Sequence, residues 1–161
     1  MTGTPGTGKS SAAKILKKKG FAVIVLNSEI KRHKLYSSYD RKRKTYVVDF
    51  GKIEKFLKKE LKQEKYQNKI ALIESHLSHL LSPKIVNAVI VLRCEPAVLE
   101  KRLKRKGWNA EKIRENTEAE IIGIIEYEAR RKHRKVFVID TTNLKPEKIA
   151  ERIKHLNLKK R

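Results

Sequence analysis

The first residues of the chain have the types and spacing of a phosphate-binding loop. Residues 3–10 (GTPGTGKS) match the pattern G-x-x-x-x-G-K-[ST] at every fixed position. The glycines let the backbone turn tightly, so that its N–H groups and the start of the next helix can surround an anion. Lys9 would contact the β- and γ-phosphates, and the Ser10 hydroxyl would bind Mg²⁺. The motif predicts a nucleoside triphosphate site, and the helical pattern of residues 11–19 argues against the alternative, a chance glycine-rich turn.

A second group of polar residues follows the apolar run 69–74. Glu74 ends this run, and a carboxylate at the carboxyl end of a buried strand lies where P-loop proteins place their second magnesium-handling group. We expect Glu74 to act on Mg²⁺ through water and His76 to orient a water molecule or a phosphate oxygen. The alternatives are a solvent-facing charge for Glu74, and helix packing or capping for His76 and His79.

The elements that must position these groups alternate between strands and helices. Short apolar runs rich in Val and Ile are typical of parallel strands covered on both faces. Helical patterns lie between the runs, with Asp49 and Asn109 as N-caps and Pro96 and Pro146 in first turns. The order predicts an α/β fold, a doubly wound parallel sheet flanked by helices. The expected strands are 21–27, 69–74, 87–93 and 135–140, and the expected helices are 11–19, 50–64, 96–106, 110–132 and 146–157.

One strand of this plan is absent from the sequence. A phosphate-binding loop follows a β-strand, and we place that strand in the middle of the sheet, between 69–74 and 87–93. Only Met1 and Thr2 precede the loop, which is too few residues for a strand of about five. The neighbouring strands could close up, another segment could fill the gap, or the native chain could start earlier. We favour the last alternative, in which the 161-residue chain should bind ATP weakly.

Length and composition indicate one domain. At 161 residues and 39% hydrophobic content, the chain is long enough for a sizeable core. No apolar run approaches the roughly 18 residues of a membrane span, and no signal peptide precedes the loop. The single cysteine, Cys94, excludes an intrachain disulfide and fits a small buried residue in a cytoplasmic protein.

The charge of the chain is strongly unbalanced. Forty Lys and Arg residues against eighteen Asp and Glu give a formal net charge of +22. Such an excess predicts contact with nucleic acid or a ribonucleoprotein. The alternative is a lysine-rich thermophile surface, although ion-pair networks need both signs of charge. The densest basic runs are 31–44, 101–106, 129–135 and 158–161.

Several motifs together resemble one known family. They are LY-x-x-YD at 35–40, ESHLSHLLS at 74–82, VLRCEP at 91–96 and RL-x-x-x-GW-N-x-x-K-x-x-EN-x-EAEI at 102–121. With the phosphate-binding loop, they resemble the adenylate kinase isoenzyme 6 family, that of the coilin-interacting nuclear ATPase, which has archaeal members. The resemblance implies a nucleoside monophosphate kinase fold, and an enzyme that uses ATP with Mg²⁺ to phosphorylate AMP and also hydrolyses ATP. It further implies a role in maturation of the small ribosomal subunit, through a small-subunit ribosomal protein and rRNA.

The same resemblance assigns segments and residues of the site. It implies a monophosphate-binding segment at about 28–66, in which Lys31 and Arg32 grip the acceptor, and a short lid at about 103–112. Lys31 stands where an arginine is commoner and cannot make the bidentate contact of a guanidinium. The residues expected to bind ATP are Gly3, Gly6, Thr7, Gly8, Lys9, Ser10 and Ser11, with Ser10 and Glu74 acting on the metal.

The lid and the strand end supply the remaining expected groups. Arg102 lies in the helix that leads to the lid, where it joins Lys9, Glu74 and His76 as a catalytic residue. Lys106 replaces an arginine of the family's R-G-aromatic signature, and Trp108 would either cover the base or pack within the lid. Glu74 and His76 correspond to an acid-x-His element whose acid is normally aspartate.

These residues leave three functions open. The first is a nucleoside monophosphate kinase, in which Lys9, Mg²⁺ and lid cations such as Arg102 and Arg105 offset the charge on the transferred group. The second is a ribosome-assembly ATPase switch with little kinase activity, favoured by the charge, in which His76 positions the attacking water. A short lid makes leakage to hydrolysis plausible. The third is another small-molecule kinase of this fold, of the shikimate or gluconate type.

Overall fold

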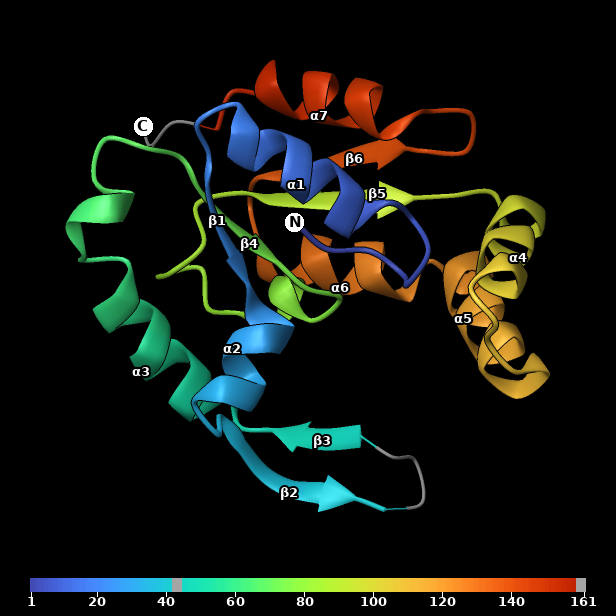
Figure 1. Ribbon diagram of the computed structural model, residues 1–161, viewed down its shortest axis with the longest axis horizontal. Coiled ribbons are helices and arrows are strands. Elements are labelled where there is room, and N and C mark those ends of the chain that lie inside the picture. Colours follow the sequence, from blue (N-terminus) through green and yellow to red (C-terminus); the bar gives the residue numbers. More distant parts are fainter. Residues whose placement is uncertain (42–44, 159–161) are drawn as a thin grey trace.

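Two pairs of parallel strands form the centre of the molecule. The computed structural model describes residues 1–41 and 45–158. Strand β1 (Ala22–Val25) pairs with β4 (Ala71–Glu74), and β5 (Val89–Arg93) pairs with β6 (Val136–Asp140). Helices cover both faces of these strands (Figure 1), which explains their continuous apolar sequences. The predicted α/β architecture, with its four parallel strands, is confirmed, and each strand is shorter than the apolar run that predicted it.

The two faces of β5 pack against different helices. Ile90 and Leu92 belong to a core cluster shared with α1 (Lys9–Lys18) and α7 (Pro146–Lys154), which lie side by side. Val89 and Val91 pack on the other face with Ala129 of α6 (Ile124–Lys132). Side chains alternate between the two faces of a strand, so β5 packs against α1 and α7 on one face and against α6 on the other. The fold therefore has three layers, helix–sheet–helix.

The segment after β1 forms a unit that projects from the sheet. It contains α2 (Leu26–Arg32), an antiparallel hairpin of β2 (Tyr36–Asp40) and β3 (Thr45–Val48), and α3 (Phe50–Glu60). The expected N-cap is confirmed, since the Asp49 side chain accepts a hydrogen bond from the Lys52 N–H. Short 3₁₀ turns follow at Glu64–Tyr66 and Ser78–Leu80. Figure 1 shows the hairpin at the lower edge of the molecule.

The single helix predicted over 110–132 is wrong. Two helices occupy this range, α5 (Ala110–Ile122) and α6, separated by Gly123 in a left-handed conformation with φ 71°. A Cβ atom at this position would lie 2.9 Å from Nη1 of Arg93, so the glycine also gives room to that guanidinium. The kink lets α5 leave the sheet and pack against α4 (Pro96–Arg105) as a second projecting arm (Figure 1).

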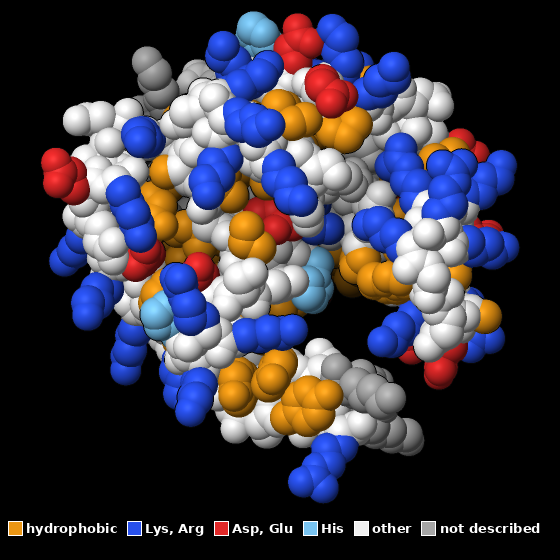
Figure 2. Space-filling view, viewed as in Figure 1, with side chains coloured by type: hydrophobic (Ala, Val, Ile, Leu, Met, Phe, Trp, Pro, Cys, Tyr) orange, Lys and Arg blue, Asp and Glu red, His pale blue; other side chains and the backbone are white. Residues whose placement is uncertain are grey.

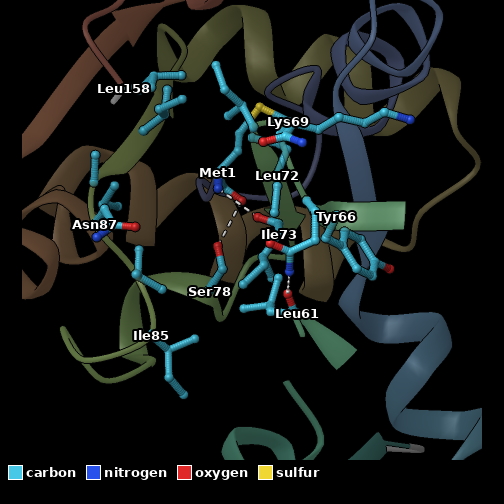
Figure 3. Close-up of a pocket in the computed structure, with 18 residues that line it drawn as sticks. Met1, Leu61, Tyr66, Lys69, Leu72, Ile73, Ser78, Ile85, Asn87 and Leu158 are labelled. Atoms are coloured by element: carbon cyan, nitrogen blue, oxygen red, sulfur yellow. Dashed lines mark hydrogen bonds between the residues drawn. The ribbon is translucent and has the colours of Figure 1, made fainter. Parts of the chain in front are cut away.

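Met1 and Thr2 join the two pairs of strands at one end only. The Met1 nitrogen donates to the Ile73 carbonyl (2.7 Å), and the Ser75 N–H donates to the Met1 carbonyl (3.2 Å). On the other side, Thr2 forms a parallel bridge with Val91. The sequence therefore places the central position correctly, and the neighbouring strands do not close up along their length. A cavity of about 590 Å³ separates β4 from β5 behind Met1 (Figure 3).

Two further expectations concern single features. Cys94 is a buried free thiol that packs with Leu99 and Leu103, as the sequence predicts. Within the described ranges, no helix combines the length and the apolar character that crossing a membrane requires.

Candidate active site

The phosphate-binding loop wraps the start of α1 beside the carboxyl end of β5. Gly8, with φ 95°, stands immediately before Lys9, the first residue of α1. Gly3 has φ 136°, and a Cβ atom there would lie 2.4 Å from the Leu92 carbonyl oxygen. Only glycine fits this close approach of two backbones. These glycines let the loop turn tightly into the N-terminus of α1, which is where we expect an anion to bind.

Lys9 is buried inside the loop that precedes it. Its Nζ donates to the carbonyl oxygens of Gly3 (2.6 Å) and Thr4 (2.9 Å). Burial lowers the pKa of Lys9 to about 8, against a smaller opposing effect of Glu74. The Lys9 ammonium is thus held by two carbonyl oxygens of the same loop.

Glu74 meets the loop from β4. The Ser10 hydroxyl donates to Glu74 Oε1 (3.3 Å), and the glutamate is only 6% exposed. The alternative of a solvent-facing charge at Glu74 is therefore wrong. A hydroxyl and a carboxylate oxygen side by side suit Mg²⁺, which prefers oxygen ligands and takes few of them from the protein beside a nucleotide. The described residues contain no group of three or more His, Cys, Asp and Glu side chains able to hold a metal by themselves.

The two histidines after β4 have different surroundings. His76 is half-buried, and burial, together with the charge of Lys9, lowers the pKa of its imidazole. His79 is 2% exposed, and its ring nitrogens contact Thr2 Oγ1 (3.0 Å) and Glu128 Oε2 (2.9 Å). His79 is thus a packed structural group, whereas the lowered pKa of His76 favours its neutral ring.

Arg102 lies against the loop that follows β6. Its guanidinium donates to the carbonyl oxygens of Thr141 (2.8 Å) and Thr142 (2.9 Å). The Thr141 hydroxyl in turn contacts the carbonyl oxygen of Thr7 (3.0 Å). Arg102 therefore contacts the phosphate-binding loop only through Thr141. The sequence did not indicate that Thr141 lies beside this loop.

The expected acceptor and lid residues lie on the two projecting arms. Lys31 and Arg32 are exposed at the end of α2, where Arg32 pairs with Glu29 (2.5 Å). Trp108 packs against the buried cluster that contains Leu99, Leu103 and Ile113, which favours the packing role over contact with a base. Figure 2 shows a hollow between the hairpin and the α4–α5 arm, with Lys and Arg side chains along its sides. The structure brings together Lys9, Ser10 and Glu74, whereas Lys31 and Arg32 remain exposed at the end of α2.

A buried carboxylate also reaches the loop, and the sequence analysis missed it. Glu120 of α5 accepts a hydrogen bond from the Thr4 hydroxyl and ion-pairs with Arg93 (2.8 Å). Both charged residues fall within the motifs noted above, 102–121 and 91–96. The spacing of those motifs does not predict that Glu120 and Arg93 meet beside the phosphate-binding loop.

Comparison with known proteins places the chain in a family. Residues 1–123 match a family model described as an AAA domain. A protein of Methanocaldococcus jannaschii is 38% identical over 154 residues, covering 95% of this chain and 81% of its own length. Proteins of Methanosarcina mazei (43%, covering 88% and 77%) and Sulfurisphaera tokodaii (40%, covering 95% and 78%) are similar.

The chain belongs to the family of P-loop kinases that these relatives and the matching AAA domain represent. All three relatives carry the name "putative adenylate kinase", without an isoenzyme. The family and the α/β architecture agree with the nucleoside monophosphate kinase fold expected from the sequence. The match covers the phosphate-binding loop, the strand that ends at Glu74 and α4.

Proposed function

We propose that the protein is an adenylate kinase, which transfers the γ-phosphoryl group of ATP to AMP and releases two molecules of ADP. The observation that carries this proposal is the meeting of Lys9, Ser10 and Glu74 at the mouth of the phosphate-binding loop. The names of the archaeal relatives support AMP as the acceptor and argue against a shikimate or gluconate kinase.

Phosphoryl transfer to AMP needs alignment and positive charge more than it needs a base. The attacking oxygen of AMP is already anionic, so no proton has to be removed from it. Lys9 would exchange its two carbonyl contacts for β- and γ-phosphate oxygens and hold the transferred group in line. Ser10 and Glu74, the latter through water, would hold Mg²⁺, which offsets charge on the phosphates when bound.

The two projecting arms would supply the other positively charged groups that contact the phosphates. Lys31 and Arg32, in the segment 28–66, would bind the acceptor phosphate from the α2 side of the hollow. Arg102 and Arg105 lie on α4, Arg102 just before the proposed lid segment 103–112 and Arg105 within it. Closing the arms would bring their charges toward the phosphates and exclude water.

Hydrolysis of ATP is the expected side reaction. Water can replace AMP when the short lid leaves the site accessible, and a half-buried neutral imidazole can orient that water. His76 has these properties and lies close enough to Lys9 for the lysine charge to affect its pKa. We therefore assign His76 to the ATPase reaction.

A second function, in assembly of the small ribosomal subunit, is favoured by the charge of +22. A kinase with small anionic substrates does not need an excess of this size, and Lys and Arg side chains are spread widely over the face shown in Figure 2. The excess suits rRNA and a small-subunit ribosomal protein bound to it. In this function ATP hydrolysis would release the protein from the particle.

One experiment separates the two functions. ADP formation from ATP plus each nucleoside monophosphate, and phosphate release from ATP alone, are measured with and without purified small-subunit particles. A kinase gives fast, AMP-dependent ADP formation that the particles do not change. An assembly ATPase gives phosphate release that the particles stimulate.

A further inference from the structure

A buried glutamate on α5 holds the phosphate-binding loop from the side of the lid. Glu120 is 3% exposed, and its carboxylate accepts hydrogen bonds from three donors. They are the Thr4 hydroxyl, Arg93 Nε (2.8 Å) and the Cys94 N–H (2.9 Å). A carboxylate this deeply buried is stable only because its oxygens are paired in this way.

Thr4 connects this carboxylate with Lys9. Besides its hydroxyl contact with Glu120, Thr4 offers its carbonyl oxygen to Lys9 Nζ (2.9 Å) and to the Thr7 hydroxyl (2.9 Å). Rotation of the Thr4 peptide would therefore move one of the two carbonyls that hold the lysine. Thr4 is 2% exposed, so solvent cannot replace Glu120 as the partner of its hydroxyl.

Arg93 ties the same carboxylate to both helices at the kink. Its Nη2 donates to the Glu120 carbonyl oxygen (2.8 Å), and its Nη1 donates to Glu126 of α6 (3.0 Å). The absence of a side chain at Gly123 leaves room for the guanidinium. The end of β5, the start of α6 and the lid arm α5 thus meet at one ion pair, and that pair touches the phosphate-binding loop.

We propose that Glu120 is a positioning residue for phosphoryl transfer. It fixes the Thr4 peptide, and through that peptide the resting place of the Lys9 ammonium, to the arm that carries the lid. The inference rests on the proposed function for its effect on turnover. Its effect on nucleotide binding depends only on the phosphate-binding loop. The competing explanation is that Glu120 merely stabilises the packing of α5 on β5.

Two substitutions test the contact from its two ends. Thr4→Val keeps the size of the side chain and removes the hydroxyl, whereas Glu120→Gln keeps the shape and removes the charge. We expect each to weaken ATP affinity, measured by calorimetry, and kcat/KM by roughly 10-fold, the size of effect seen when a supporting partner of a binding group is removed. We expect the loss in the double variant to be smaller than the sum of the two single losses, because the Thr4–Glu120 contact is altered in both. Thr4→Ser, which restores a hydroxyl, should recover most of the affinity.

Glu118→Gln is the matched control, since Glu118 lies on the same helix and its side chain is 61% exposed. It should leave ATP affinity unchanged. If Thr4→Val binds ATP as the unaltered protein does, or if the losses of the two single variants add in the double variant, the positioning role is wrong. Thr4→Val still decides the question if Glu120→Gln does not fold. Failure of the proposed function would look different: the unaltered protein would bind ATP and form no ADP from AMP, while the affinity changes could still be measured.

Discussion

At the scale of single residues, the proposed function depends most on Lys9. Its ammonium is held by two carbonyl oxygens of its own loop, where we propose that the ATP phosphates bind. Both transfer and hydrolysis need the same bound γ-phosphate, so Lys9→Ala should lower the rate of both by about 10²–10³-fold, as removal of one transition-state donor does. ADP formation with AMP and phosphate release without AMP are the measurements. Near-normal turnover in either reaction would refute the assignment of the loop.

The buried position of Lys9 also predicts a pH dependence of ATP binding. Burial lowers its pKa to about 8, so the free protein loses this charge as the pH rises through 8. Phosphate oxygens favour the charged form, and ATP binding should therefore weaken by about 10-fold or more between pH 7 and pH 9.5, with uptake of a proton above pH 8. Calorimetric titration in buffers of different ionisation enthalpy measures both quantities. Lys9→Met should bind weakly and without this pH dependence; the same slope in that variant would assign the effect to another group.

His76 should distinguish the two reactions. Only hydrolysis requires a positioned water, so His76→Ala should slow phosphate release by about 10-fold or more and leave ADP formation from AMP nearly unchanged. His79→Ala serves as a contrast, because it leaves Thr2 and Glu128 without their buried partner and should lower the melting temperature. Equal losses in both reactions of His76→Ala would mean that His76 only supports the structure of the site.

At the scale of elements, the sequence predicts what is local and periodic. The phosphate-binding loop, the four apolar strands and the Asp49 cap follow from patterns within a few residues. The meeting of Glu74 with Ser10 follows from the rule that parallel strands end at the same edge of a sheet. The hairpin was missed because β2 (YSSYD) is polar and a basic run follows it, and because a register shift between Tyr36 and Ser38 interrupts the alternation of its side chains.

The helix break was missed for a different reason. Helical residues continue on both sides of Gly123, and an isolated glycine inside a helical pattern is often tolerated. What fixes the break is Arg93, thirty residues earlier in the chain, whose guanidinium occupies the space beside the glycine. The Thr4–Glu120 contact is likewise long-range, joining residues 116 positions apart. Such contacts depend on the finished packing and cannot be obtained from spacing.

The kink makes a prediction about stability. Gly123→Ala places a Cβ 2.9 Å from Arg93 Nη1 in a left-handed backbone, whereas Gly107 has almost the same φ (72°) with no atom within 4 Å of the added carbon. Gly107→Ala should therefore cost only the conformational term, about 1–2 kcal/mol of unfolding free energy. Gly123→Ala should cost clearly more, because the Arg93–Glu120 pair must shift as well. Urea unfolding of both variants checks this, and equal losses would contradict the role assigned to Arg93.

The gap between β4 and β5 leads to a second prediction for the elements, which concerns the melting temperature. Ile73 and Ser75 bond with Met1, so Ala71, which shares their edge of β4, faces the cavity. An apolar segment of about five residues joined to Met1 should pair with both strands and raise the melting temperature by roughly 10 °C. It should also strengthen ATP binding, because the loop follows directly. A Gly-Ser extension of equal length is the control; equal melting temperatures and equal ATP affinity in the two extended forms would contradict the prediction.

At the scale of the whole molecule, the charge predicts a partner. If the surface binds rRNA, the affinity should fall steeply with salt, because each neutralised phosphate releases counterions. Of the basic runs expected to matter, residues 42–44 and 159–161 lie outside the described residues, so the described run 129–135 offers the better test. Arg131→Glu with Arg134→Glu should reduce the salt slope and leave the formation of ADP unchanged, since both residues are exposed and far in sequence from the loop. An affinity that is flat between low and physiological salt would favour the thermophile-surface explanation.

The central claim is that this loop, with Glu74 beside it, serves transfer of a phosphoryl group between nucleotides. The most direct measurement follows ATP, AMP and ADP together by chromatography, with the Lys9→Ala protein beside the unaltered one. An adenylate kinase should form two ADP for each ATP and AMP consumed, omission of AMP should leave only slow phosphate release, and Lys9→Ala should lower both rates by about 10²–10³-fold. ATP that is consumed at the same rate with and without AMP, with phosphate and a single ADP as products, would contradict it.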